Sequence, residues 1–203
     1  NVKRFILMSA NGVRPKGTDY QRTKYKAEMY LKKTKLNWTI FRPSLVFGPP
    51  RGKIEFCTQL KNDMLSLPIP APLFYRGFLP FKAGTFMLTP IHVKNVADFF
   101  VKSISQELCY EKIYNLGGVD SLTWKEILHQ ISLASKKRTW KIPTPVFIIK
   151  MLALILDRFE WFPVTRDQLT MLMEGNTVSD NYFEEFSITP KKFIKDNLRY
   201  LGY

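Results

Sequence analysis

Three segments decide the fold: Phe-Ile-Leu-Met-Ser at residues 5–9, Tyr-Gln-Arg-Thr-Lys at 20–24, and Trp-Thr-Ile-Phe-Arg-Pro-Ser-Leu-Val-Phe-Gly-Pro at 38–49. The apolar run at 5–9 is typical of a short buried strand. Gly17-Thr18-Asp19 predicts a turn and a helix start, with Thr18 or Asp19 as the cap and the helix running to about Lys35. Residues 37–41 predict a second strand, which Arg42-Pro43 ends. Such a unit predicts a right-handed crossover and a parallel strand pair.

The predicted helix carries a tyrosine and a lysine four residues apart, Tyr20 and Lys24, so both lie on one face of it. Ser9, at the end of the preceding strand, can reach that face. A cation beside a phenol favours the phenolate, and a serine hydroxyl can hold a carbonyl in place, so the pattern suits proton transfer. The alternative is structural, with a packed phenol and a solvated amine.

The remainder of the chain alternates strands and helices early and is mostly helical late. Between residues 54 and 116 we expect a helix over 54–65, a Pro-rich and aromatic loop over 68–82, an extended segment over 87–93, a helix over 95–105 and a strand over 112–116. A capping box at 123–126 predicts the start of a helix that ends near 135. We then expect helices over 143–175 with a break at 162–163, and a short helix after Pro190. The loop over 68–82 is interpreted either as a substrate loop or as a surface loop without a role. This order predicts an α/β fold with a parallel sheet and a mostly helical C-terminal lobe, divided into residues 1–119 and 120–203.

The composition fits a folded protein with acidic partners. The 203 residues are 45% hydrophobic and 14% aromatic, and the net charge is +14. Such a charge favours nucleic acid, anionic lipid or an acidic protein surface. The densest group of basic residues lies within 22–35 on one predicted helix, where it forms a solvated face, and aromatic residues are not interleaved with it. We therefore expect no nucleic-acid partner.

Cysteine and histidine usage argues against disulfides and metals. Cys57 and Cys109 lie far apart without a CxxC motif, which favours a reducing compartment such as the cytoplasm or the mitochondrial matrix. His92 and His129 lack metal-ligand spacing, so we expect no metal site, and we interpret His92 as structural. The apolar run 146–156 is too short to span a membrane. It is either a helix packed on the core or a surface that docks on a membrane or a membrane-bound partner.

Taken in order, these segments resemble the short-chain dehydrogenase/reductase superfamily, and more narrowly its atypical, extended branch of NAD-dependent epimerase/dehydratase-like proteins. Within that branch the chain is most similar to the group of the nucleotide-binding accessory subunit of respiratory complex I. The resemblance covers nearly the whole chain. Besides the segments quoted first, it is carried by residues 90–98, 114–118, 122–128, 165–169 and 188–190.

The resemblance implies a Rossmann-like fold that binds NAD or NADP. It implies that Tyr20 is the general acid/base, that Lys24 holds the ribose of the nucleotide and lowers the pKa of Tyr20, and that Ser9 orients a substrate carbonyl or hydroxyl. The backbone that would line the nicotinamide pocket belongs to Pro43, Ser44, Leu45 and Val46. The implied reaction is hydride transfer between the nucleotide and an alcohol or carbonyl of a small-molecule substrate, alone or within an epimerisation.

The glycine-rich turn that binds a dinucleotide in this superfamily is not found among the ten glycines of the chain. We therefore expect this chain to be the C-terminal part of a longer protein, with an N-terminal nucleotide-binding half of about 100 residues as its partner. Two positions depart from the pattern of the branch. Ser9 is followed by Ala10-Asn11, where the enzymatic members often carry another hydroxyl residue, and Lys94-Asn95 stands where the branch often has two acids. The alternative is therefore a non-catalytic nucleotide-binding accessory subunit or assembly factor of a membrane respiratory complex, peripheral to the membrane.

Overall fold

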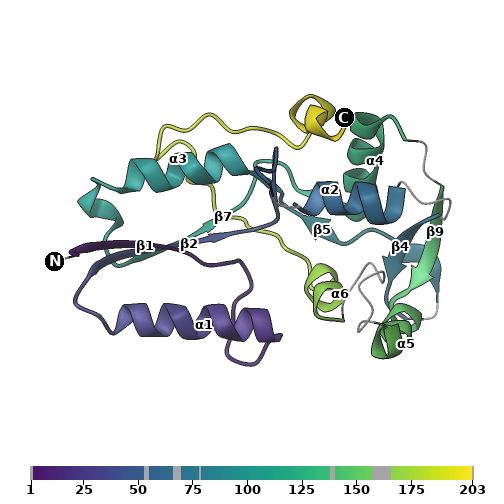
Figure 1. Cartoon of the computed structure of the whole chain (residues 1–203), viewed down its shortest axis with the longest axis horizontal. Coiled ribbons are helices and arrows are strands. Elements are labelled where there is room, and N and C mark those ends of the chain that lie inside the picture. Colours follow the sequence, from purple (N-terminus) through teal and green to yellow (C-terminus); the bar gives the residue numbers. More distant parts are fainter. Residues whose placement is uncertain are drawn as a thin grey trace. The chain divides into compact units, whose positions relative to one another are not determined.

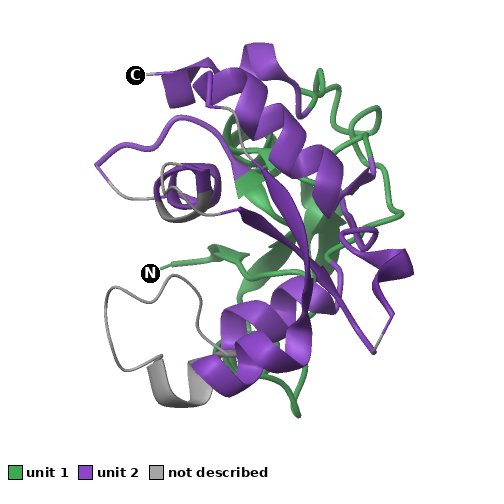
Figure 2. Cartoon of the chain, turned by 90° about the vertical axis from the view of Figure 1, so that its right-hand side faces the viewer, with its two compact units in different colours: residues 1–46, 89–120, 176–192 green, residues 47–88, 121–175, 193–203 purple. Residues whose placement is uncertain are grey.

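The computed structural model describes residues 2–52, 55–65, 70–77, 79–137, 140–156 and 166–202. The chain divides into two compact units, which Figure 2 colours separately. Unit 1 comprises residues 1–46, 89–120 and 176–192, and unit 2 comprises residues 47–88, 121–175 and 193–203. The chain passes from unit 1 to unit 2 after residue 120, one residue beyond the expected boundary at 119. Each unit, however, is built from three separate segments of the chain. The division into a dinucleotide-binding domain and a helical lobe therefore stays a prediction.

Unit 1 is built on a three-stranded parallel sheet. Its strands β1 (Arg4–Met8), β2 (Asn37–Pro43) and β7 (Lys112–Leu116) lie in the order β1-β2-β7. Both neighbouring pairs are parallel, as predicted for the first two strands. Helix α1 (Asp19–Lys32) lies on one side of this sheet and helix α3 (Val93–Ser103) on the other (Figure 1). This arrangement is the predicted α/β fold.

The central strand β2 is buried on both faces, which explains why three of its residues 38–41 are large and apolar. All four residues 38–41 are buried. Trp38 and Ile40 pack with Leu31 of α1, whereas Phe41 packs with Phe99 of α3. Because successive side chains of a strand point to opposite faces, a strand covered by a helix on each side is mostly apolar, and the buried Thr39 hydroxyl donates to the Cys109 carbonyl.

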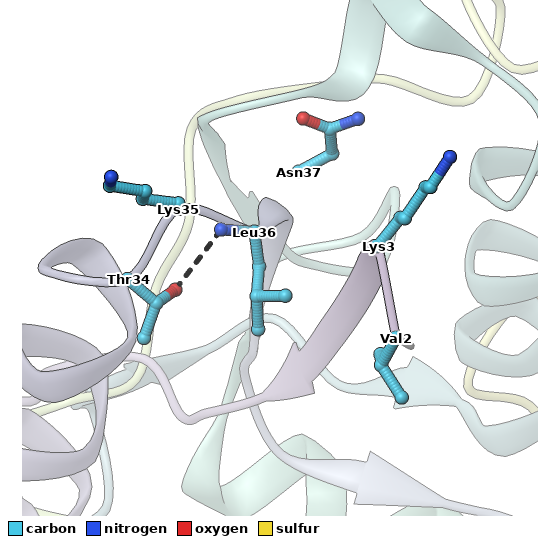
Figure 3. Close-up of a pocket in the computed structure, with 6 residues that line it drawn as sticks. All are labelled: Val2, Lys3, Thr34, Lys35, Leu36 and Asn37. Carbon is cyan, nitrogen blue, oxygen red and sulfur yellow. Dashed lines mark hydrogen bonds between the residues drawn. The ribbon is translucent and has the colours of Figure 1, made fainter.

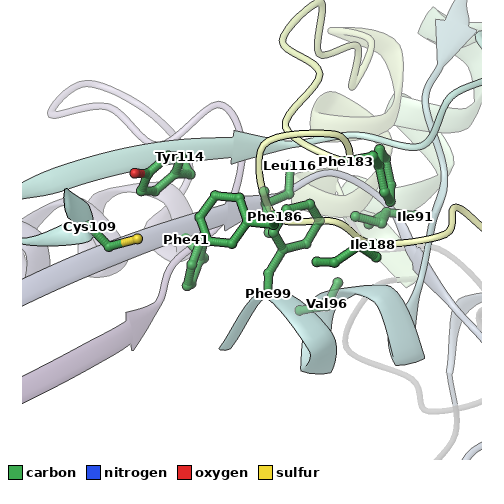
Figure 4. Close-up of a cluster of buried hydrophobic side chains, with 10 residues drawn as sticks. All are labelled: Phe41, Ile91, Val96, Phe99, Cys109, Tyr114, Leu116, Phe183, Phe186 and Ile188. Atoms are coloured by element: carbon green, nitrogen blue, oxygen red, sulfur yellow. The ribbon is translucent and has the colours of Figure 1, made fainter. Parts of the chain in front are cut away.

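The core on the α3 side is largely aromatic and includes a segment from late in the chain (Figure 4). Phe186 lies 5.1 Å from Phe99 and 6.4 Å from Phe41, measured between ring centroids. The complete cluster is Phe41, Ile91, Val96, Phe99, Cys109, Tyr114, Leu116, Phe183, Phe186 and Ile188. Residues 183–188 are therefore part of the core of unit 1.

Two polar clamps hold this late segment to α3. The Asn95 amide donates to the Thr189 carbonyl at 2.9 Å, and its oxygen accepts the Lys191 N–H at 2.8 Å. The Lys102 ammonium donates to the Phe186 carbonyl at 2.8 Å. Asn95 is almost fully buried, so its side chain replaces the backbone partners that the segment lacks there.

The expected starts of two helices are confirmed. Thr18 and Gln21 form a capping box at α1, and Thr123 and Glu126 form one at α4 (Trp124–Ser135). Helix α1 ends at Lys32, before the expected Lys35. Helix α3 begins two residues earlier than expected because His92 caps it, its Nδ1 accepting the Lys94 N–H at 3.0 Å.

Unit 2 contains short strands and helices packed around Trp124. The Trp124 indole N–H donates to the Pro72 carbonyl at 2.9 Å, and the Phe74 and Phe86 rings lie 6.0 and 5.7 Å away. The elements are α2 (Phe56–Leu60), a π-helical turn (Lys61–Leu65), β4 (Ala71–Tyr75), β5 (Met87–Leu88), β8 (Leu122–Thr123), α4, β9 (Lys141–Pro145), α5 (Val146–Leu156), α6 (Arg166–Met173) and 3-10 helices at Pro80–Lys82 and Lys195–Gly202. Strand β4 pairs in parallel with β9, and β5 is antiparallel to β8. Three further short elements, β3 (Val46–Phe47), β6 (Ile91–His92) and a 3-10 turn (Glu107–Cys109), complete the described structure.

Two sequence predictions are wrong in unit 2. The stretch predicted as a loop over 68–82 contains strand β4, and the stretch predicted as helical from 143 begins with the end of β9. Prolines at 72, 143 and 145 lie within this strand pair and argue against strands when the sequence is taken locally. Pairing between segments about seventy residues apart overrides that local preference. The predicted helix over 54–65 is a short helix followed by the π-helical turn, and the predicted break at 162–163 lies outside the described residues.

The two cysteines are free thiols, buried one in each unit, Cys109 in unit 1 and Cys57 in unit 2. Burial raises the pKa of the Cys57 thiol well above its ordinary value. Over the part of the chain that the structure describes, no helix has both the length and the apolar character needed to cross a membrane.

Candidate functional site

The parallel strands of unit 1 end side by side, and the predicted site residues lie at this edge. Strands β1, β2 and β7 end at Met8, Pro43 and Leu116. The Asn11 N–H donates to the Pro43 carbonyl at 2.9 Å, and the Ser44 N–H donates to the Leu116 carbonyl at 2.8 Å. In open α/β sheets, ligands bind outside the carboxyl ends of the strands. This carboxyl edge is therefore the candidate site.

Tyr20 and Lys24 lie together on α1 beside the end of β1. The Lys24 Nζ atom lies 5.8 Å from the centroid of the Tyr20 ring. It also donates a hydrogen bond to the Met8 carbonyl, at 3.2 Å. Tyr20 is 48% exposed, so its ring is half-buried and open to a ligand on one side. The structure thus brings the predicted pair to the carboxyl edge.

The protonation of Tyr20 differs from the expectation. Lys24 was expected to lower the pKa of Tyr20, whereas partial burial raises the pKa of this phenol above its ordinary value. Burial thus favours the neutral phenol of Tyr20. The Lys24 ammonium keeps two N–H donors beyond the one on Met8, which suit the hydroxyls of a ribose.

Ser9 is engaged in a buried ionic cluster. Its side chain is 2% exposed, and its hydroxyl donates to Glu28 Oε1 at 2.5 Å. The Glu28 carboxylate is fully buried and accepts two hydrogen bonds from Arg42, Nε to Oε1 at 2.8 Å and Nη2 to Oε2 at 2.5 Å. Burial alone would raise the pKa of Glu28, but the hydrogen bonds from Arg42 and Ser9 outweigh it and lower that pKa. The sequence analysis missed Glu28, although it lies on the same helical stripe as Tyr20 and Lys24.

The segment Pro43 to Val46 has its main-chain groups committed to neighbours. Besides the bonds of Pro43 and Ser44 given above, the Leu45 carbonyl accepts the Ile91 N–H at 2.8 Å. The Ser44 hydroxyl donates to the Thr89 carbonyl. The side chains of Leu45 and Val46 are partly buried, and that of Val46 packs against the aromatic core around Phe41. The segment is thus fixed in place, and its backbone has few free polar groups.

A second part of the edge was not predicted from the sequence. The Asn11 amide donates to Asn176 Oδ1 at 2.8 Å, and the Thr89 hydroxyl accepts the Val178 N–H at 3.0 Å. Gly118 is required here, because a Cβ at this position would lie 1.9 Å from the Pro90 carbonyl oxygen. These bonds join loops that are 87 or more residues apart in sequence, so no local sequence motif predicts them.

The surroundings of His92 are defined by local geometry. His92 is buried and serves as the cap of α3, in agreement with its structural interpretation. Burial lowers the pKa of its imidazole, and the cations Lys191 and Lys94 act in the same direction. Among the residues that the structure describes, no three His, Cys, Asp or Glu side chains are grouped so that they could hold a metal ion.

A hollow of about 530 Å³ lies at the opposite end of the sheet, before β1 and β2 begin (Figure 3). Its lining residues are Val2, Lys3, Thr34, Lys35, Leu36 and Asn37. The Thr34 hydroxyl accepts the Leu36 N–H at 3.4 Å across its rim. None of the predicted site residues lines this hollow, so it is separate from the carboxyl edge.

Comparison with known proteins places this chain among Rossmann-like α/β folds. No protein-family model matches the chain. UDP-glucose 4-epimerase from Vibrio cholerae is 24% identical to it over 177 residues, which cover 77% of this chain and 51% of that protein. The chain thus spans about half the length of this curated relative.

Solved structures of sugar-nucleotide epimerases share the fold. The UDP-glucose 4-epimerase of Thermus thermophilus, solved with NAD, matches with a TM-score of 0.64 at 17% identity, over 98% of this chain and 63% of that one. The UDP-glucuronic acid 4-epimerase of Bacillus cereus, solved with UDP-glucuronic acid and NAD, matches with a TM-score of 0.59 at 16% identity, over 100% of this chain and 62% of that one. At these identities the matches show the fold, and function has to be argued from the site.

Proposed function

We propose that this chain forms the catalytic edge of an NAD(P)-dependent oxidoreductase of the short-chain dehydrogenase/reductase type that acts on a sugar nucleotide, as an epimerase does. The observation that carries the proposal is the placement of Tyr20 and Lys24 beside the Met8 carbonyl, at the carboxyl edge of the parallel sheet. The similarity to UDP-glucose 4-epimerase supports the substrate class.

The residues present fit a nicotinamide nucleotide. Lys24 has donors left for ribose hydroxyls, and the partly buried Leu45 would offer apolar surface to a planar ring. The bound NAD or NADP would supply a hydride acceptor and donor. Tyr20 would exchange a proton with the substrate oxygen whose carbon takes part in that transfer. Ser9 is the exception among the predicted site residues, since its hydroxyl proton is already donated to Glu28.

A nucleotide-binding half is the partner that this proposal requires. Strand β1 has one neighbour, β2, among the described residues of its sheet, so its other edge can accept a further strand. We propose that this half carries the glycine-rich turn for the pyrophosphate and follows the same parallel order. Its residues, and not those of this chain, would select NAD or NADP.

The test is a Tyr20→Phe variant of the natural protein that contains this chain. Native mass spectrometry should detect a bound dinucleotide in both forms, and epimerisation should be assayed with UDP-glucose and UDP-glucuronic acid. We expect the variant to retain the nucleotide and to lose turnover by about 10²- to 10⁴-fold, the usual contribution of a general acid/base. The matched control is Tyr30→Phe, which removes a hydroxyl from the same helix at a 77% exposed side chain.

The non-catalytic alternative predicts a different result. An accessory subunit of a respiratory complex would retain nucleotide and assembly with Phe at position 20 and would show no turnover with either residue. The relatives described above are sugar-nucleotide epimerases, and they give this alternative no support. Absence of bound nucleotide and of turnover in the unaltered protein would contradict the proposed function.

A further inference from the structure

We propose that the buried Ser9–Glu28–Arg42 cluster is a positioning device that fixes α1, and with it Tyr20 and Lys24, against the carboxyl ends of β1 and β2. The inference rests on the proposed function, because it assigns the cluster to the same site. It also reassigns Ser9 from a substrate-binding residue to a positioning residue.

Tyr20, Lys24 and Glu28 follow one another at intervals of four along α1 and therefore form one stripe facing the sheet. Lys24 bonds to the carbonyl of Met8, and Glu28 bonds to the hydroxyl of the next residue, Ser9. The stripe is thus attached at Met8, the last residue of β1, and at Ser9, which follows it, and its free end carries Tyr20.

The ends of two strands share one carboxylate, that of Glu28. Ser9 follows β1, and Arg42 lies near the end of β2, yet both bond to Glu28. The two Arg42 bonds are parallel N–H to oxygen contacts, the geometry that fixes direction best. The cluster therefore sets the position of α1 relative to both strands at the level of the site.

The Ser9 hydroxyl has a fixed direction of hydrogen bonding. An ionised carboxylate can only accept, so the single Ser9 proton must point at Glu28. The Ser9 oxygen can then only accept a hydrogen bond from anything else. It cannot donate to a substrate carbonyl unless it leaves Glu28, which would leave a buried carboxylate with one partner fewer.

The same helix provides a contrasting ion pair. Arg22 and Asp19 bond at 2.5 Å, but their side chains are 48% and 82% exposed, against 22% and 0% for Arg42 and Glu28. Water competes with an exposed ion pair, which therefore stabilises the fold little. A buried ion pair is shielded from water, and breaking it leaves an unpaired buried charge. Asp19→Asn is therefore the matched control for Glu28→Gln.

The experiment follows Tyr20 directly. The natural protein would be labelled with ¹³C at tyrosine Cζ, with the Tyr20 resonance assigned from Tyr20→Phe, and titrated by NMR. If the cluster positions α1, Glu28→Gln should release Tyr20 toward solvent, and its titration midpoint should fall toward that of an ordinary tyrosine. Asp19→Asn should leave the midpoint where it is. An unchanged Tyr20 midpoint in folded Glu28→Gln protein would overturn the proposal.

Turnover separates positioning from catalysis. We expect Glu28→Gln to lower kcat by about 100-fold, the effect of misplacing a reacting group by about 1 Å, with little change in KM. Ser9→Ala should cost less than about tenfold, because Arg42 still holds Glu28. If Glu28→Gln does not fold, Arg42→Lys retains the charge and removes the paired contact, and it should shift the Tyr20 midpoint in the same direction.

The outcomes remain distinct from those of the proposed function. A loss in Ser9→Ala as large as that in Tyr20→Phe, with an unmoved Tyr20 midpoint, would make Ser9 a catalytic residue and overturn its reassignment. If the unaltered protein shows no turnover, the proposed function fails. The NMR titration still decides whether Glu28 controls the environment of Tyr20.

Discussion

The hydroxyl of Ser9 donates to a carboxylate, and this one bond limits the chemistry open to the serine. Sequence analysis placed Tyr20 and Lys24 together because both lie on one helix, where spacing alone fixes proximity. It could not find the partner of Ser9, since Glu28 and Arg42 come from different elements and meet only after folding. At the residue scale, local pairs were predictable and the buried cluster was not.

Glu28 predicts how stability depends on pH. Its pKa is lowered in the folded protein by Arg42 and Ser9, despite burial, and the Lys32 cation acts in the same direction. The stabilisation is therefore present above the unfolded pKa of about 4.3 and is lost as the pH falls through the lower folded pKa. We expect Glu28→Gln to cost roughly 3 kcal/mol at pH 7 and progressively less below about pH 4, measured by urea unfolding.

The comparison for this titration is an exposed pair elsewhere in the chain. Asp196 and Arg199 bond at 2.7 Å with side chains that are 66% and 76% exposed. Asp196→Asn should change the free energy of unfolding by less than about 0.5 kcal/mol at any pH in this range. A cost of Glu28→Gln that is equal at pH 7 and pH 3 would show that the carboxylate's charge is not what stabilises the cluster.

At the scale of elements, caps and periodicity predicted well wherever local sequence decides the structure. Strand β7 and helix α4 have the expected bounds, and the capping boxes at Thr18 and Thr123 are present. Strands β4 and β9 were missed because prolines mask their strand character and because their pairing joins distant segments. The packing of residues 183–188 in the core of unit 1 was missed for the same reason, because it also joins distant segments of the chain.

The clamp at Asn95 gives an element-scale prediction. Asn95→Ala would leave the Lys191 N–H and the Thr189 carbonyl without the bonds that α3 now supplies. We expect a loss of about 1–3 kcal/mol in unfolding free energy and faster hydrogen exchange at the Lys191 amide, measured by NMR. Asn115→Ala, which removes a 3.1 Å bond to the Asp180 side chain, is the control and should leave exchange at Lys191 unchanged. Equal exchange at Lys191 in both variants would rule out the clamp.

At the scale of the whole chain, composition predicts the net charge but not the division into two units. The net charge of +14 is read directly from composition, and it suits the negatively charged diphosphates of a dinucleotide and of a sugar nucleotide. The two units could not be found that way, because each is assembled from three segments without a linker of distinctive composition between them.

Unit 1 should depend on its aromatic core. Phe41 is fully buried among Phe99, Tyr114 and Phe186, and Phe41→Ala should cost about 3–5 kcal/mol. Hydrogen exchange with mass spectrometry should show the largest gain in peptides from the three segments of unit 1. Leu108→Ala, at an 80% exposed side chain in the same unit, should change neither stability nor exchange. An even gain across both units would mean that Phe41 does not stabilise unit 1 selectively.

The two buried cysteines give each unit its own chemical reporter. Cys109 belongs to the aromatic cluster around Phe41, whereas Cys57 lies in the first turn of α2, and both side chains are almost fully buried. An alkylating reagent can reach either sulfur only when the surrounding structure opens. The unaltered protein therefore records, in the order in which its two thiols become modified, which of its units opens first.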